Sequence, residues 1–129
     1  MITSRALEAI DGHGPYRHIH GIVIGDTEPV HDFLADLREP DLSDFFARFD
    51  KLEEGMLREQ VWRQVGSWFK PLRHVNNVWQ VASTSHRLLG FRNGEVLILT
   101  NGFYKTGGET PPKQIKKSEK VQAQFTARR

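Results

Sequence analysis

The stretch Val96-Leu97-Ile98-Leu99-Thr100-Asn101-Gly102-Phe103-Tyr104-Lys105 joins an apolar run to a glycine, two aromatic residues and a cation. The apolar run predicts a buried β-strand over residues 95–100, and Gly102 predicts a turn after it. Before the strand, Asn93-Gly94 predicts a hairpin turn of type I′, which requires a positive φ at both central residues. We therefore expect two paired antiparallel strands, over 87–91 and 95–100.

After this hairpin, Thr110-Pro111 predicts the start of a helix that ends near residue 125. Four lysines of that helix follow the spacing i, i+3, i+4 and i+7, namely Lys113, Lys116, Lys117 and Lys120. This spacing places them on one helix face, which we call the lysine stripe. Because such a face does not belong in a core, it favours a polyanion as the partner, and RNA is the natural candidate.

The N-terminal half predicts a strand over 16–24 followed by two helices. Asp26-Thr27 is expected to cap the first helix, with Pro29 in its first turn. The second helix has an apolar face and is expected to end at Gly55; that face consists of Leu42, Phe45, Phe46, Phe49 and Leu52. We expect these helices to form a hairpin on the sheet, with the three phenylalanines in the core.

The remaining segments complete an α+β domain over residues 1–129. Residues 1–15 show little periodicity and are expected to be an irregular extension. Residues 56–75 are ambiguous, and Trp62, Trp68 and Phe69 would form an apolar surface patch if that segment were exposed. A further strand is predicted over 78–82, which gives the order β-α-α-β-β-β-α.

Charge is distributed unevenly along the 129 residues. Residues 1–60 contain 13 acidic and 6 basic side chains, whereas residues 61–129 contain 3 and 12. The asymmetry favours a basic surface for nucleic acid, and the alternative is chance clustering on a solvated surface. Without cysteine, the chain has no disulfide and no thiolate zinc site. No apolar run resembles a signal peptide or reaches membrane-spanning length, so we expect a cytoplasmic protein without a membrane partner.

The C-terminal motif resembles that of the RelE/HigB superfamily of toxin ribonucleases, in particular its phage-derived, HigB-type branch. That branch typically ends in Gly-Phe-x-Lys-Lys-Thr-x-Lys-Thr-Pro-x-x-Glu-Ile. The chain agrees with this pattern at Gly102, Phe103, Lys105, Thr110, Pro111 and Ile115. It departs from the pattern at Thr106, Gly107, Glu109 and Gln114. The likeness extends over about residues 18–120, but only this motif is specific.

The resemblance implies a RelE-like fold, with a small, twisted, mainly antiparallel sheet, and cleavage of messenger RNA, usually on the ribosome. In this family the ribose 2′-hydroxyl attacks the adjacent phosphate without metal or cofactor, and a small helix-turn-helix antitoxin is the partner. Two positions differ: Ala82 stands where the family usually has an arginine, and Gln80 where it has an acid. The alternatives are therefore a degenerate module that binds RNA or the ribosome without cutting, and a phage accessory protein that acts through protein contacts.

Four residues are the candidates for catalysis. Arg87, at a position where the resemblance implies an arginine, would clamp the scissile phosphate; its alternative is a cross-strand pair with Glu95. Lys105 would stabilise transition-state charge or act as the acid, or be a solvated loop lysine. Tyr104 would stack on a base or donate a proton, or pack half-buried. His86 would be the base only if the strand start is distorted, because it otherwise faces away from Arg87.

Further residues are expected to contact the RNA backbone without performing chemistry. These are Lys70, Arg73 and His74, together with the lysine stripe. The pattern His18-x-His20, with His13 nearby, is weak as a metal site because no cysteine or suitably spaced carboxylate accompanies it. No metal is therefore expected.

Overall fold

The computed structural model describes residues 1–56, 59–63, 66–105 and 107–127, which form an α+β fold. Six strands form one mixed sheet in the spatial order β1-β2-β6-β5-β4-β3. The strands are β1 (Ile2–Ala6), β2 (Ile19–Ile24), β3 (Phe69–Pro71), β4 (Trp79–Ala82), β5 (His86–Asn93) and β6 (Val96–Tyr104). The helices are α1 (Pro29–Ala35), α2 (Asp41–Met56), α3 (Pro112–Ala127) and the short 3-10 helix η1 (Glu59–Trp62). β2 and β6 pair in parallel, and the other neighbouring strands pair antiparallel.

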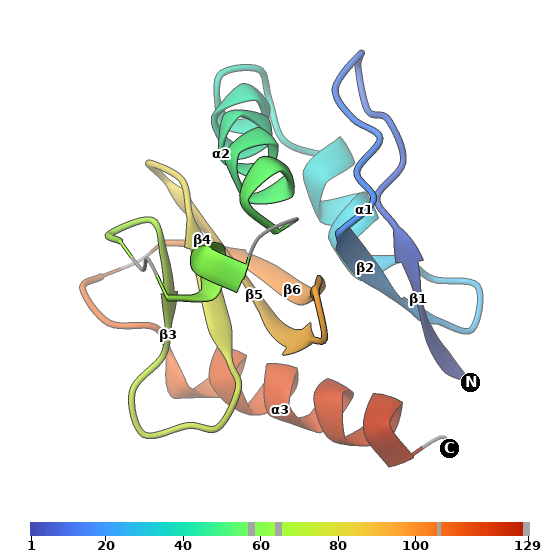
Figure 1. Ribbon diagram of the computed structural model, residues 1–129, viewed down its shortest axis with the longest axis vertical. Helices are drawn as coiled ribbons and strands as arrows, with labels where there is room; N and C mark the ends of the chain where they lie inside the picture. The colour runs from blue at the N-terminus through green and yellow to red at the C-terminus, as the bar shows by residue number, and fades with distance from the viewer. Residues whose placement is uncertain (57–58, 64–65, 106, 128–129) are drawn as a thin grey trace.

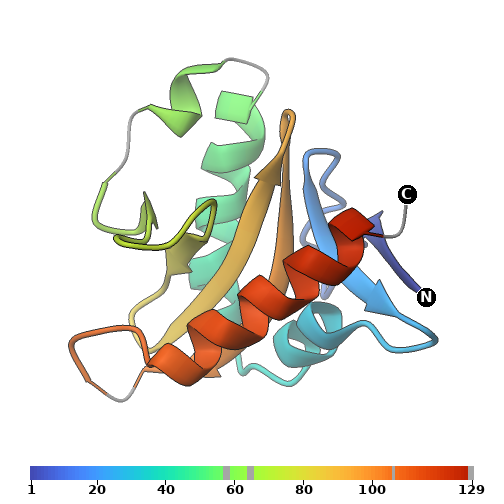
Figure 2. The same ribbon diagram turned by 90° about the horizontal axis from the view of Figure 1, so that it is seen from below.

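The helices cover both faces of the sheet (Figure 1). α1 and α2 lie on one face, and α3 runs diagonally across the other, as Figure 2 shows from below. The larger core lies under α1 and α2 and includes Phe49, Val81 and Leu88. A smaller core lies under α3 and includes Phe91 and Phe125. We call these two sides the α2 face and the α3 face. Among the described residues, no helix is long and apolar enough to cross a membrane.

The predicted helix face of α2 is confirmed as core, since Phe45, Phe46 and Phe49 are almost completely buried. Two predictions of helix ends were wrong. Gly55 lies inside α2, which continues to Met56. α1 has Glu28 at its N-cap without a side-chain cap, because Thr27 is instead paired with Ile24 in a tight backbone turn.

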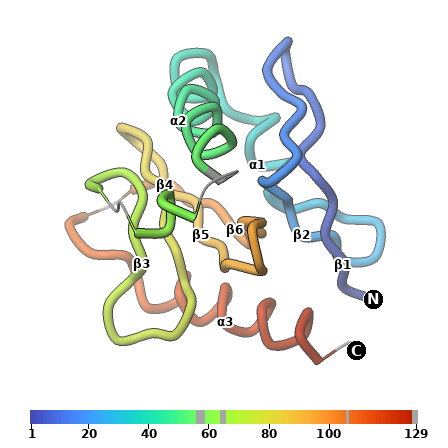
Figure 3. Tube along the Cα trace, in the orientation of Figure 1, coloured from blue at the N-terminus to red at the C-terminus, as the bar shows by residue number. Residues whose placement is uncertain are grey.

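The prediction of an irregular N-terminus was wrong for residues 2–6, which form β1, whereas residues 7–15 lie outside the helices and strands. β1 pairs with β2 along its whole length, from Ile2 opposite Ile24 to Ala6 opposite His20. The tube in Figure 3 shows the chain then looping away from the sheet and returning into β2. Because β1 is an edge strand and its side chains are half-buried, it lacks the apolar alternation that identifies strands in a sequence.

The hairpin between β5 and β6 exists, but its turn differs from the prediction. Asn93 pairs with Val96, so Gly94 and Glu95 are the central residues. Gly94 has a φ of 65°, and positive φ among the described non-glycine residues occurs only at Asp11, His74 and Asn77. A glycine at the first central position with a positive φ indicates a type II′ turn rather than type I′.

Gly102 is not in a turn, because β6 continues through it to Tyr104. A Cβ atom at Gly102 would come within 2.6 Å of Phe33 Cδ2 and 2.8 Å of Leu88 Cδ2. The glycine therefore allows α1 to approach β6 closely.

The ambiguous segment contributes to the core, so the exposure that an apolar surface patch would require does not occur at Trp62 and Phe69. Trp62 and Phe69 are buried, and the half-buried Trp68 packs against the core cluster. The Trp62 ring meets the Trp79 ring edge-on, with centroids 5.1 Å apart. This contact joins η1 to β4.

Candidate anion-binding site

A hollow of about 90 Å³ opens on the α3 face, where β4 ends and β5 begins. We call it the cationic hollow, because Lys70, Arg87 and Lys105 all line it. Glu109 is the carboxylate among its described lining residues, so the local charge is positive. All three cations come from the basic half of the chain, as the charge asymmetry predicted.

Strand register explains why these side chains share one face. Lys70 lies opposite Gln80, and Arg87 lies opposite Phe103, and directly opposed residues of antiparallel strands point to the same side. Their sequence neighbours, such as Val81 and Leu88, belong to the core of the α2 face. Alternation along each strand therefore directs the cations to the α3 face.

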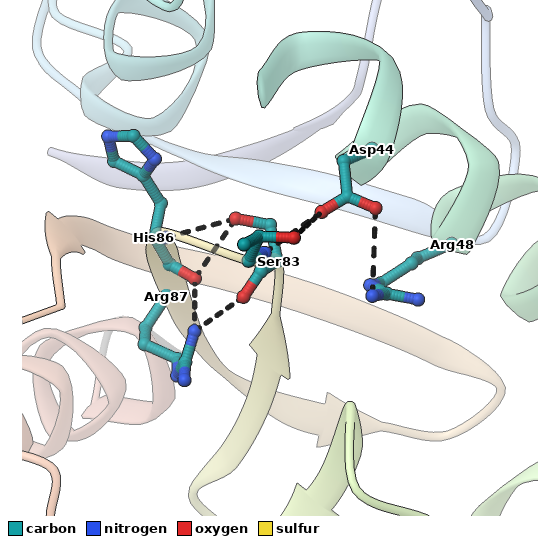
Figure 4. Close-up of polar contacts among 6 residues, drawn as sticks. Asp44, Arg48, Ser83, His86 and Arg87 are labelled. Carbon is teal, nitrogen blue, oxygen red and sulfur yellow. Dashed lines mark hydrogen bonds and ion pairs between the residues drawn. The ribbon is translucent and has the colours of Figure 1, made fainter. Parts of the chain in front are cut away.

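The guanidinium of Arg87 is held in place by backbone carbonyls (Figure 4). Its Nη1 donates to the carbonyl oxygen of Ser83 at 2.6 Å and to that of His86 at 2.8 Å. No described residue accepts a hydrogen bond from Nε or Nη2. Burial, and secondarily the charge of Arg48, lowers the pKa of Arg87, but a guanidinium stays protonated at neutral pH. Arg87 thus presents a fixed charge with unused donors.

The turn that supplies the Ser83 carbonyl is itself tied to α2. The backbone N–H of Thr84 donates to Asp44 Oδ2 at 2.9 Å, and Asp44 Oδ1 lies 3.6 Å from Arg48 Nη2 (Figure 4). The expected alternative for Arg87, a pair with Glu95, is wrong. Glu95 belongs to the turn at the opposite end of the β5–β6 hairpin.

His86 and Tyr104 lie on the α2 face and not in the cationic hollow. The two residues lie directly opposite each other on the paired strands β5 and β6, and their rings meet edge-on with centroids 5.3 Å apart. The His86 ring also meets Phe33 at 5.8 Å, whereas Tyr104 is 63% exposed. Figure 4 shows the imidazole of His86 and the guanidinium of Arg87 pointing in opposite directions. The strand start is regular, so the distortion that a base at His86 required is not present.

The proposed RNA-contacting residues occupy three places. Lys70 lies in the hollow, whereas Arg73 and His74 lie in the β3–β4 connection, at the opposite end of β4 from Ala82. The lysine stripe is exposed along α3, whose first turn follows the hollow directly. Lys113, the first lysine of the stripe, follows Pro111 of the hollow by two positions.

The histidines at the start of β2 serve as structural partners. His18 Nδ1 contacts Glu53 Oε2, and His20 Nδ1 lies 3.1 Å from the Ser4 hydroxyl. Across the part of the chain that the structure describes, no three His, Asp or Glu side chains form a group suited to a metal. A pocket of about 300 Å³ lies beside Phe69, and one of about 430 Å³ lies beside Tyr16. Unlike the cationic hollow, neither has three lysine or arginine side chains among its described lining residues.

Sequence reasoning missed Gln80, Glu109 and Thr110 as members of the site. The Thr110 hydroxyl donates to Gln80 Oε1 and connects the loop before α3 to β4. The pairing of position 80 with Lys70 depends on strand register, which the sequence does not reveal. No family model and no curated protein sequence matches the chain, so the geometry of the hollow carries the functional argument.

Proposed function

We propose that this chain is a RelE-like, metal-independent endoribonuclease that cleaves messenger RNA, in association with the ribosome, as the toxin of a toxin–antitoxin pair. The observation that carries the proposal is the convergence of Lys70, Arg87 and Lys105 in one hollow on the sheet. Guanidinium and ammonium groups held together stabilise the extra negative charge of a phosphorane. The fold, a mixed sheet with helices on both faces, is compatible with this assignment.

In the proposed reaction, the ribose 2′-oxygen forms a bond to phosphorus and the bond from phosphorus to the 5′-oxygen breaks. Arg87 binds a non-bridging oxygen through its unused donors, while Lys105 stabilises charge on the phosphate or protonates the departing 5′-oxygen. Glu109 is the carboxylate in the described lining that can accept the 2′-hydroxyl proton. The products are a 2′,3′-cyclic phosphate and a free 5′-hydroxyl, and no redox or metal step is needed.

Messenger RNA is a cytoplasmic substrate, so the proposal places the protein there. A toxin of this kind requires an inhibitor, and we propose a small helix-turn-helix antitoxin that covers the cationic hollow. Its acidic side chains would complement the charge of Lys70 and Lys105.

The test is induced expression in a bacterial host, combined with analysis of the RNA ends. Expression of the chain should arrest growth and produce messenger fragments with 5′-hydroxyl ends, and Arg87→Ala should relieve both effects. His86→Ala is the matched control, because its side chain lies on the other face, and it should remain toxic. Persistent toxicity of Arg87→Ala would remove Arg87 from the mechanism.

A second candidate function is a module that binds RNA or the ribosome without cutting. It is favoured by Ala82 and Gln80, which take the place of an arginine and an acid in the resembled family. Sedimentation of the protein with translating ribosomes, with the message left intact, would support it. Failure to bind RNA at low salt would instead point to a protein that acts through protein contacts.

A further inference from the structure

We propose that Gln80 is a phosphate-binding residue whose side-chain amide donates a hydrogen bond to a phosphate oxygen in the cationic hollow. This inference rests on the proposed function only in taking an RNA phosphate as the occupant of the hollow. It assigns a role to Gln80, which stands where the resembled RelE/HigB superfamily has an acidic residue. An amide here gives the site a neutral donor where a carboxylate would repel the ligand.

The position of Gln80 fits this role. The residue is 6% exposed, yet its side chain lines the hollow. It points to the α3 face because its neighbours Trp79 and Val81 belong to the core of the α2 face. Burial of an amide costs free energy unless its polar atoms form hydrogen bonds. A buried glutamine that faces a hollow is therefore expected to form a hydrogen bond with whatever occupies the hollow.

The orientation of the amide is set by Thr110. The Thr110 hydroxyl donates to Gln80 Oε1, so the acceptor end of the amide is occupied. The donor end, Nε2, must then point away from Thr110. A donor that is fixed before the ligand arrives loses little entropy on binding.

Nε2 is open to the hollow. No described residue accepts a hydrogen bond from it. The fully buried side-chain nitrogens that lack a partner in the described part of the chain belong to Arg48, Trp62 and His86, and Gln80 is not among them. Solvent therefore reaches Nε2, and the hollow is the space that its side chain lines.

A carboxylate at this position would change the electrostatics of the hollow. It would lie opposite Lys70 in the strand register and would share the hollow with Arg87. A negative charge there would pair with the cations that a phosphate needs and would also repel the phosphate itself. The amide has nearly the same shape and leaves both cations available.

The experiment measures the affinity of the full chain for a short single-stranded RNA with 2′-O-methyl groups, which cannot be cleaved because it has no attacking hydroxyl. Gln80→Glu keeps the shape, and fluorescence anisotropy at pH 8 should show affinity about 10- to 100-fold weaker than that of the unsubstituted chain. At lower pH, titration of the introduced carboxyl should restore affinity relative to the unsubstituted chain at the same pH. RNA phosphodiesters keep their charge over this range, so the recovery reports on the protein.

Gln80→Met tests the donor without adding charge, and should weaken binding about 5- to 15-fold at every pH. Thr110→Val, which removes the orienting hydroxyl, should weaken binding by a smaller factor, while Thr110→Ser retains the donor and should bind normally. Thermal unfolding of each variant shows whether it is folded. If Gln80→Met binds as well as the unsubstituted chain, or if the loss in Gln80→Glu does not depend on pH, the inference is overturned.

The same variants separate this inference from the proposed function. If the chain binds the modified RNA as described but never cleaves ordinary messenger RNA, the nuclease proposal fails and the role of Gln80 stands. If the chain cleaves RNA and all Gln80 variants retain full affinity, the role of Gln80 fails alone. Absence of any RNA binding by the unsubstituted chain at low salt overturns the role of Gln80 outright.

Discussion

The two faces of the sheet differ in chemistry where β5 begins and β6 ends. On the α2 face, His86 and Tyr104 pack edge-on beside Phe33. On the α3 face, Arg87 and Lys105 line a polar hollow. These four residues come from two adjacent pairs in the sequence, and strand alternation sends the members of each pair to opposite sides.

The difference shows that neighbours in a motif need not act together. A glycine–aromatic–cation run at a strand end suggests one catalytic group, but the backbone divides it into an aromatic packing side and a side whose cations line the hollow. Other residues that line the hollow with Arg87 and Lys105 come from β3, from β4 and from the loop before α3. A residue far away in sequence, Lys70, therefore belongs to the site, whereas His86, next to Arg87, does not.

The largest expected effect is on the rate of RNA cleavage, which should fall when Arg87 on the α3 face is replaced but not when His86 on the α2 face is replaced. Arg87→Ala should slow cleavage by about 10²- to 10³-fold, because it removes a fixed donor from the charge that develops on the phosphate. His86→Ala should leave the rate within about threefold, since a residue outside the site contributes little differential binding. Single-turnover rates on messenger RNA with ribosomes would measure both. Equal losses in the two variants would contradict the division into faces.

The aromatic side should show its importance in stability rather than in RNA chemistry. Gly102→Ala places a methyl group within 3 Å of Phe33 and Leu88, and overpacking of this kind costs about 1–3 kcal/mol in the free energy of unfolding. Gly108→Ala is the control, because a Cβ there meets no atom within 4 Å, and it should change stability by less than about 0.5 kcal/mol. Urea titrations of both variants provide the measurement.

The salt dependence of RNA binding distinguishes the hollow from the lysine stripe. Lys105→Ala and Lys120→Ala should each reduce the slope of log affinity against log salt by about 0.7, the value expected for one phosphate contact on a single strand. The loss of affinity should be larger for Lys105→Ala, because Lys105 acts together with Arg87 in a concave site. An unchanged slope in Lys105→Ala would show that this side chain does not contact phosphate.

The smallest effect is expected for the exposed member of the aromatic side. Tyr104→Ala removes one edge-on contact with His86 and little buried area, so it should cost about 1 kcal/mol or less. The same urea titration would test it. A loss as large as that of Gly102→Ala would mean that Tyr104, although exposed, supports α1.

The sequence predicted the elements whose periodicity is strong. The phenylalanine face of α2, the hairpin of β5 and β6, and α3 all carry clear signals. It failed for β1, because an edge strand with half-buried side chains does not alternate. It also failed at Gly102, where a close approach by Phe33, and not a turn, requires the glycine.

For the site, the three cations were predicted from the sequence, but the contribution of Gln80 was not. The charge asymmetry indicated a basic surface, and Arg87, Lys105 and Lys70 all line the same hollow. Membership of Gln80 depends on its register with Lys70 and on a hydroxyl from Thr110, thirty positions further along. Contacts between residues so far apart produce no periodic pattern in the sequence, so they cannot be predicted from it.

The place of β6 in the sheet has a consequence for synthesis of the chain. β6 lies between β2 and β5, yet it follows β2 by more than seventy residues in the sequence. A nascent chain that has not yet released residues 96–104 therefore lacks the strand that joins the two halves of the sheet. Contacts of such long range form late and slow folding. A chain that ends before residue 96 would therefore lack β6 and would not assemble the cationic hollow.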